Sequence, residues 1–246
     1  MEGICLNKNN KFAISIAAIG IFVLITLGVY IYRVYENSNA SWNLPLSGKV
    51  IVVDPGHGGV DGGAVGQGKI IEKEIALEIA LMLREYLQGS GAFVIMTRET
   101  DRDLAPEDLR GYSRRKTYDL HKRLEIINAP DRDLFVSIHL NAVPSPRWRG
   151  AQTFFHPANE ESQKLSRFIQ DELRKNLGNT DRYAKKLTNI FLLKEAKIPG
   201  AIVEVGFLSN PDEARLLSQK DYQNKIAISI YQGILRYFTN EAAPKK

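Results

Sequence analysis

From residue 49 onwards, short apolar runs alternate with longer segments that repeat their apolar residues at helical spacing. KVIVVD at 49–54 is typical of a buried strand, whereas residues 72–88 place their apolar side chains on one face of a helix. The pattern predicts strands at 49–54, 92–97, 133–140, 150–156, 189–193 and 200–207, and helices at 72–88, 115–128, 161–177, 212–218 and 221–238. Such alternation predicts a single three-layer α/β/α domain with a mostly parallel central sheet.

The N-terminal part of the chain differs, because residues 12–32 carry no charged side chain. A run of this length can cross a bilayer as a helix, and Lys8 and Lys11 before it predict a cytoplasmic N-terminus and an exported remainder. We therefore expect a short cytoplasmic segment at 1–11, a transmembrane or signal-anchor helix at 12–32, a stalk at 33–47, a folded domain at 48–240 and a tail at 241–246. A cleaved signal peptide is the alternative, and export follows from either reading.

Composition limits the chemistry of the exported part. Cys5, the only cysteine, precedes the apolar run, so the exported part has neither a disulfide nor a thiolate metal site. The formal net charge of +5 is modest and is consistent with an ordinary mixed-charge surface. Because the chain shows no basic stripe interleaved with aromatic residues, we expect no nucleic-acid binding.

Two of the four histidines stand where strands are predicted to end. His57, in VVDPGHGG, and His139, in SIHLNA, each follow a run of β-branched residues and precede small or polar ones. In parallel sheets, binding groups gather beyond the carboxyl ends of the strands, so the two imidazoles are expected to lie near each other. They would supply two ligands of a zinc site, whereas His121 and His156 are interpreted as structural.

Two glutamates are candidates for the rest of such a site. Glu72 opens the helix at 72–88 and would be the third ligand, although an acid there also serves as a simple partner of the helix dipole. Glu204 interrupts the apolar run AIVEVGF, where burial would raise its pKa and suit it to general acid/base work. A solvent-facing glutamate on an edge strand is the alternative for Glu204.

Five blocks of this sequence together resemble a known family. They are DPGHGGVDGGAVG (54–66), IEKEIAL (71–77), MTRETD (96–101), SIHLNA (137–142) and VEVGFLSN (203–210). In this order they resemble the zinc-dependent N-acetylmuramoyl-L-alanine amidases of bacterial cell walls, over about residues 49–238. The resemblance implies that His57, Glu72 and His139 bind Zn²⁺ and that Glu204 is catalytic. Glu74 is the nearest rival of Glu72, but the family's glutamate precedes a lysine, here Lys73.

The resemblance implies hydrolysis of the amide bond between N-acetylmuramic acid and L-alanine, with 48–240 as the catalytic domain. Its partners would be peptidoglycan glycan strands with stem peptides, and the membrane through 12–32. No protein activator is identified. The enzyme would act on the extracytoplasmic side, at the cell wall or spore envelope. The glycines around His57 would leave room for the peptide-bearing sugar strand. A wall-binding protein without activity and a zinc hydrolase of another amide are the alternatives.

Three segments point to one subgroup. The extended segment 103–120, GAQTFF at 150–155 and PGAIVEVGFLSNP at 199–211 resemble the sporulation amidase of endospore formers. That resemblance implies a role in cortex peptidoglycan maturation, through muramic-lactam formation. Segment 103–120 is interpreted either as a plain surface loop or as a contact for substrate or partner.

Overall fold

The computed structural model describes residues 8–39, 44–239 and 241–244, and in the N-terminal helix it describes the side chains of 17–33. Cys5, part of the predicted stalk and the end of the predicted tail lie outside the described residues. The chain divides into two compact units, Met1–Asn43 and Leu44–Lys246.

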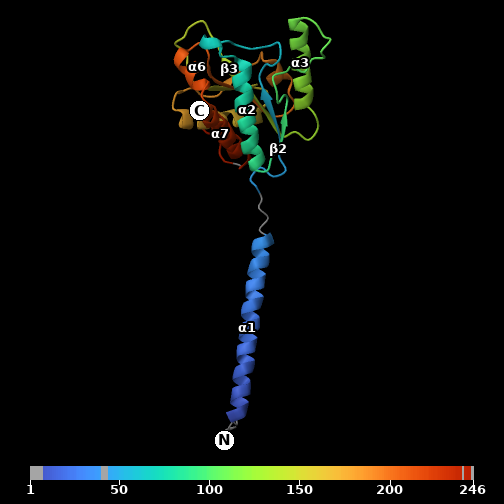
Figure 1. Cartoon of the computed structure of the whole chain (residues 1–246), viewed down its shortest axis with the longest axis vertical. Coiled ribbons are helices and arrows are strands. Elements are labelled where there is room, and N and C mark those ends of the chain that lie inside the picture. The colour runs from blue at the N-terminus through green and yellow to red at the C-terminus, as the bar shows by residue number, and fades with distance from the viewer. Residues whose placement is uncertain (1–7, 40–43, 240, 245–246) are drawn as a thin grey trace. The chain divides into compact units, whose positions relative to one another are not determined.

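The described part of the first unit is one helix, α1 (Lys8–Asn39), which includes the predicted membrane segment 12–32 (Figure 1). Within the described part of the chain, no helix combines the length and the apolarity needed to cross a membrane. The membrane-spanning role of 12–32 is thus not supported by the structure and stays a prediction from the sequence.

A six-stranded sheet forms the centre of the second unit, in the order β2-β1-β3-β6-β4-β5. Its strands are β1 (Val50–Pro55), β2 (Phe93–Met96), β3 (Leu134–Asn141), β4 (Gln152–Phe155), β5 (Lys185–Lys186) and β6 (Gly200–Phe207). All neighbouring pairs are parallel except β4 with β6, which is antiparallel. The predicted α/β domain with a mostly parallel sheet is confirmed.

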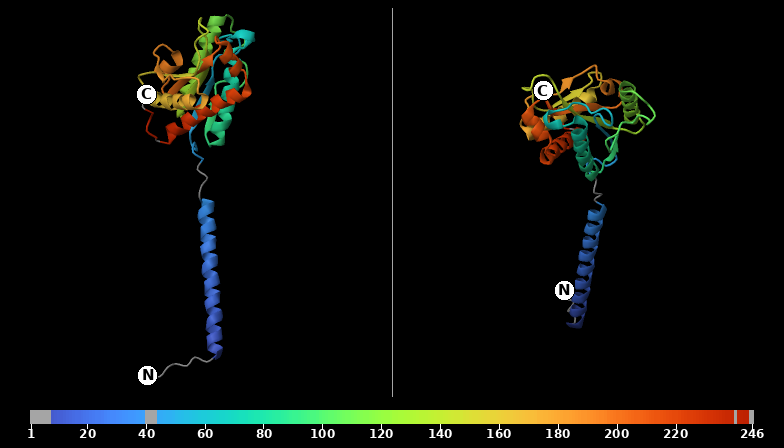
Figure 2. Two further views of the ribbon diagram at one scale, coloured as in Figure 1. Left: turned by 90° about the vertical axis from the view of Figure 1, so that its left-hand side faces the viewer. Right: turned by 45° about the horizontal axis from the view of Figure 1, so that its top comes forward.

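Helices cover both faces of the sheet (Figure 2). One face packs against α2 (Glu72–Gly89), α4 (Glu160–Leu177), α6 (Pro211–Leu217) and α7 (Lys220–Phe238), and the other against α3 (Tyr112–Ile127) and α5 (Phe191–Glu195). Gln67–Lys69 form a short 3-10 turn before α2. Because successive side chains of a strand point to opposite faces, a strand can contribute residues to the cores on both sides of the sheet.

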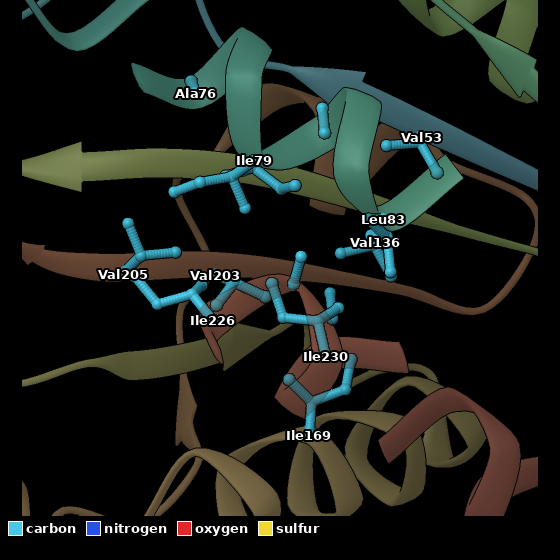
Figure 3. Packing of buried hydrophobic residues seen from close by; sticks show 14 of the residues in the cluster. Val53, Ala76, Ile79, Leu83, Val136, Ile169, Val203, Val205, Ile226 and Ile230 are labelled. Atoms are coloured by element: carbon cyan, nitrogen blue, oxygen red, sulfur yellow. The ribbon is translucent and has the colours of Figure 1, made fainter. Parts of the chain in front are cut away.

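The larger core lies between the sheet and α2, α4 and α7 (Figure 3). Val53, Val136 and Val203 from three adjacent strands face Ile79 of α2 and Ile230 of α7, and all of these side chains are fully buried. The smaller core, on the other face, includes Val52, Phe135 and Ile202. Two packed faces hold the strand ends rigidly, which is what a precise site at those ends needs.

The predicted strand at 189–193 is wrong, because Phe191–Glu195 form the short helix α5. Leu192 and Leu193 are buried against the smaller core, so the apolar run reflects packing of one helical turn. A short apolar run does not distinguish a strand from a buried helical turn. The edge strand that pairs with β4 is instead Lys185–Lys186, which has no apolar residue to mark it.

Candidate active site

His57 lies in the loop that leaves β1, in a backbone conformation that few residues adopt. Its φ is 61°, in the left-handed region, where histidine is tolerated better than bulky or branched residues. Gly58 and Gly59 follow with φ of 134° and 56°. With this sharp turn the imidazole reaches Glu72, the first residue of α2.

The side chains of His57, Glu72 and His139 meet at one point. Oε1 of Glu72 lies 3.2 Å from Nε2 of His57 and 3.1 Å from Nδ1 of His139. The two imidazole rings are 5.0 Å apart and nearly perpendicular. The Glu72 side chain is only 4% exposed, against 16% for His57 and 22% for His139, so solvent reaches the cluster from the imidazole side.

Backbone donors fix the carboxylate of Glu72. The amide of Ala64 donates to Oε2 at 2.8 Å, and that of Leu140 donates to Oε1 at 2.9 Å. Although burial opposes ionisation, hydrogen bonds and charges from His139 and His57 hold the pKa of Glu72 well below its usual range. The reading of Glu72 as no more than a partner of its helix dipole does not account for these contacts.

Glycines allow this close approach of the protein's own side chains. A Cβ on Gly56 would come within 2.4 Å of the His139 ring, and one on Gly63 within 2.6 Å of Oε2 of Glu72. The expectation that the glycines leave room for substrate is thus corrected at these two positions. They leave room for the cluster itself.

Glu204 lies beside this cluster on β6, directly opposite His139 in the parallel register. Because β6 has β3 on one side and β4 on the other, the alternative of an edge-strand carboxylate is wrong. Its Oε2 is buried without a hydrogen-bond partner, although the residue as a whole keeps partial exposure. Burial, with a smaller effect of the Glu72 charge, raises the pKa of Glu204 to about 7.

Asp61 is a site residue that the sequence analysis missed. Its Oδ2 lies 2.9 Å from Nδ1 of His57, on the ring edge opposite Glu72, and its Oδ1 accepts from the Tyr112 hydroxyl at 2.9 Å. Lys116 lies 2.9 Å from the same carboxylate. Burial lowers the pKa of His57, but its contacts with Asp61 and Glu72 outweigh burial and raise it to about 9. In the sequence, the only sign of this pairing is that an acidic residue follows His57 by four positions.

Two buried arginines hold the loop that carries His57. Arg123, 1% exposed, donates to the carboxylate of Asp54 at 2.6 Å and to the carbonyls of Pro55 and His57. Arg98 donates to the carbonyls of Pro55 and Gly56. Both arginines therefore hold the backbone of the loop, and these hydrogen bonds do not go to the side chains of the cluster.

The remaining candidates lie apart from the cluster. Glu74 is exposed on α2, His121 contacts the Phe191 ring, and His156 follows the end of β4. The structure thus gathers His57, Glu72, His139 and Glu204 and leaves the structural histidines elsewhere.

The cluster suits a divalent transition metal. His57, Glu72 and His139 each offer one ligand atom, and these atoms lie within 4.8 Å of one another. Two imidazoles and a carboxylate are a common protein ligand set for catalytic zinc. A buried carboxylate at the centre and Asp61 behind His57 create the negative potential that favours a cation there.

Comparison with known proteins agrees with this geometry. Residues 51–236 match the N-acetylmuramoyl-L-alanine amidase family. The chain belongs to that family. It is 54% identical over 222 residues to the germination-specific N-acetylmuramoyl-L-alanine amidase of Bacillus subtilis, covering 90% of this chain and 93% of that protein. It is 34% identical to the amidase LytC of the same organism, over 79% of this chain and 36% of LytC.

Solved amidase structures share the fold. The CwlD amidase of Clostridioides difficile, solved in complex with the GerS lipoprotein, matches with a TM-score of 0.76 and 42% identity over 78% of this chain and 100% of that one. The amidase AmiC2 of Nostoc punctiforme matches with a TM-score of 0.69 and 26% identity over 79% of this chain and 99% of that one. The chain is therefore a peptidoglycan amidase similar to the germination-specific enzyme, and the resemblance stated from the sequence is confirmed.

Proposed function

We propose that this amidase is zinc-dependent, with His57, Glu72 and His139 as metal ligands and Glu204 as its general acid/base. The observation that carries the proposal is the buried, unpartnered carboxylate of Glu204 beside a three-residue cluster of metal-ligand spacing. Zinc, when bound, acts as a Lewis acid that lowers the pKa of water and polarises the scissile carbonyl.

Some residues of the chain would hold the metal ligands in place, and Glu204 would transfer the proton. Asp61 orients His57, and the amides of Ala64 and Leu140 orient Glu72, so the ligands are fixed before metal binds. Glu204, whose pKa is raised to about 7, would take a proton from the attacking water. It would then return the proton to the L-alanine nitrogen as the bond to the lactyl carbonyl of N-acetylmuramic acid breaks.

The decisive experiment is mass spectrometry of purified peptidoglycan incubated with residues 41–246 and zinc. Release of stem peptides with a free L-alanine amino group would establish the bond cleaved. Cleavage of a glycosidic bond, or of a bond within the stem peptide, would contradict the proposal.

We further propose a role in spore cortex maturation, through formation of muramic lactam. The similarity to a germination-specific amidase supports it. Deletion of the gene in its own host should leave cortex peptidoglycan without muramic lactam. The complex of the Clostridioides difficile amidase with a lipoprotein supports testing for a protein partner as well.

Asp61→Asn should weaken zinc binding without unfolding the domain. The carboxylate behind a ligating histidine fixes ring orientation and raises basicity, and its loss typically costs about 10–100-fold in metal affinity. Competition with a chromophoric chelator would measure the dissociation constant. Asp108→Asn, on the exposed segment after Asp103, is the matched control and should bind zinc like the parent. Equal affinities of the two variants would contradict a role of Asp61 in orienting His57.

We also propose that the domain acts outside the cytoplasmic membrane, on the basis of the uncharged run 12–32 and the location of peptidoglycan. Protease added to intact protoplasts should therefore digest the domain from residue 44 onwards. An exported protein and a cytoplasmic protein of known location serve as controls. Protection equal to that of the cytoplasmic control would contradict export.

A further inference from the structure

A cavity lies at the β5 edge of the sheet. It has a volume of about 510 Å³ and is bounded by α4 on one side and by residues 183–186 on the other, with Phe155 among the lining side chains. None of His57, Glu72, His139 or Glu204 lines it. It is therefore a separate feature from the metal-ligand cluster.

Four basic side chains line this cavity: Arg167, Arg174, Lys185 and Lys186. Asp171 is the acid among its lining residues, and it already pairs with Lys175 and Arg236. Across the described residues, none of the four basic side chains forms an ion pair with a carboxylate. The cavity thus carries uncompensated positive charge.

One of these cations has an unused donor in the interior. Nε of Arg174 is buried and has no hydrogen-bond partner, while its guanidinium stacks on the ring of Tyr183 at 4.4 Å. Because Nε itself is closed to solvent, a ligand in the cavity would contact the terminal nitrogens of the guanidinium. The stacking holds the guanidinium plane in place, which favours planar recognition of a carboxylate.

Glu204 and the cavity lie on opposite faces of the sheet, because Phe155 of β4 points toward α4 whereas Glu204, like Ile202, points toward the α3/α5 side. Gln152 lies opposite Glu204 in the antiparallel register, so both side chains point to the same face of the sheet. The amide Nε2 of Gln152 donates to the carbonyl of Tyr183 at 3.1 Å. A polymer bound at Glu204 would therefore have to pass round the edge of the sheet formed by β4 and β5 to reach the cavity.

We propose that this cavity binds the free carboxylates of a peptidoglycan stem peptide other than the one being cleaved. This inference rests on the proposed function, because it assigns a second contact to the same polymer. Two arginines and two lysines recognise carboxylates, and the Tyr183 and Phe155 rings offer apolar surface to a peptide. The mixture fits a peptide better than a bare inorganic anion, which would use the cations alone.

The test compares the parent with two double variants of the full-length chain, Lys185→Glu/Lys186→Glu and Arg167→Gln/Arg174→Gln. Affinity for insoluble peptidoglycan freed of phosphate polymers should fall roughly tenfold or more, as expected when charge-assisted hydrogen bonds are lost. Hydrolysis of a soluble muramoyl peptide with a single stem should stay within twofold of the parent. Lys122→Glu/Lys220→Glu, which changes the net charge as much as the Lys185/Lys186 variant but lies elsewhere, should bind like the parent. Thermal melting verifies folding of each variant.

Competitors identify the ligand chemistry. A soluble stem tetrapeptide should displace the parent from peptidoglycan, whereas its fully amidated form and inorganic phosphate at equal ionic strength should not. Unchanged binding by both cavity variants would overturn the proposal. Equal competition by inorganic phosphate would overturn it in favour of a phosphate site. If the parent binds peptidoglycan through the cavity but releases no stem peptide, the proposed function fails while the cavity assignment stands.

Discussion

Replacement of His57 or His139 by alanine is expected to abolish zinc binding and amide hydrolysis together. Both imidazoles contact the same oxygen of Glu72, so the loss of either ring opens one side of the cluster. A catalytic zinc would contribute several kcal/mol to stabilisation of the transition state, so its loss should lower turnover on the order of 10³-fold or more. Elemental analysis should find about one zinc per parent chain and little in either variant.

Glu72 and Glu74 offer a matched comparison within one helical turn. Glu72→Ala should lose zinc and activity as the histidine variants do, because its buried carboxylate joins the two rings. Glu74→Ala removes an exposed carboxylate from the same turn and should keep both properties. If Glu74→Ala strips the metal and Glu72→Ala retains it, the ligand assignment is wrong.

The sequence predicts this cluster well because the residues are placed by regular elements. His139 and Glu204 lie on neighbouring parallel strands, and Glu72 is the first residue of a strongly periodic helix. In a parallel sheet these positions converge at one end, whatever the details of the loops. The strand pattern and the general rule for parallel sheets therefore predicted which end of the sheet carries the site, whereas the ligand set itself was implied by the family resemblance.

What the sequence does not predict depends on loops and on long-range pairing. Asp61 reaches His57 only because the chain turns sharply at His57 itself, with φ in the left-handed region. Arg123 and Asp54 are 69 positions apart, and no local pattern links a helical arginine to a strand carboxylate. The same holds for the edge strand Lys185–Lys186, whose pairing with β4 is decided by neighbours and not by its own residues.

Segment 103–120 shows how loops and long-range contacts escape prediction from the sequence. Its second half forms the first turns of α3, and Tyr112 and Lys116 from those turns contact Asp61. The segment is therefore more than a plain surface loop, because it reaches the residue behind His57. A direct contact between this segment and substrate stays a prediction.

Glu204→Gln should retain zinc and the fold but lose about 10²–10⁴-fold in turnover, the usual contribution of a general base. Glutamine keeps the size and polarity of the side chain but does not accept a proton at neutral pH. Zinc content and thermal melting, measured beside the rate of stem-peptide release, separate this loss from loss of metal. An inactive variant that also lacks zinc would make Glu204 a fourth ligand, and an active variant would leave the reaction without its base.

The pH dependence of the parent provides a second test of Glu204. As the proposed base, Glu204 would be competent only as the carboxylate, and burial raises its pKa to about 7. Activity should therefore fall as pH drops through this value, approaching tenfold per pH unit well below it. A bound dication would favour the ionised carboxylate, so zinc would shift this acidic limb to lower pH without reversing its direction. The residual activity of Glu204→Gln should lack the limb, so an acidic limb that is identical in parent and variant would assign the titration to another group.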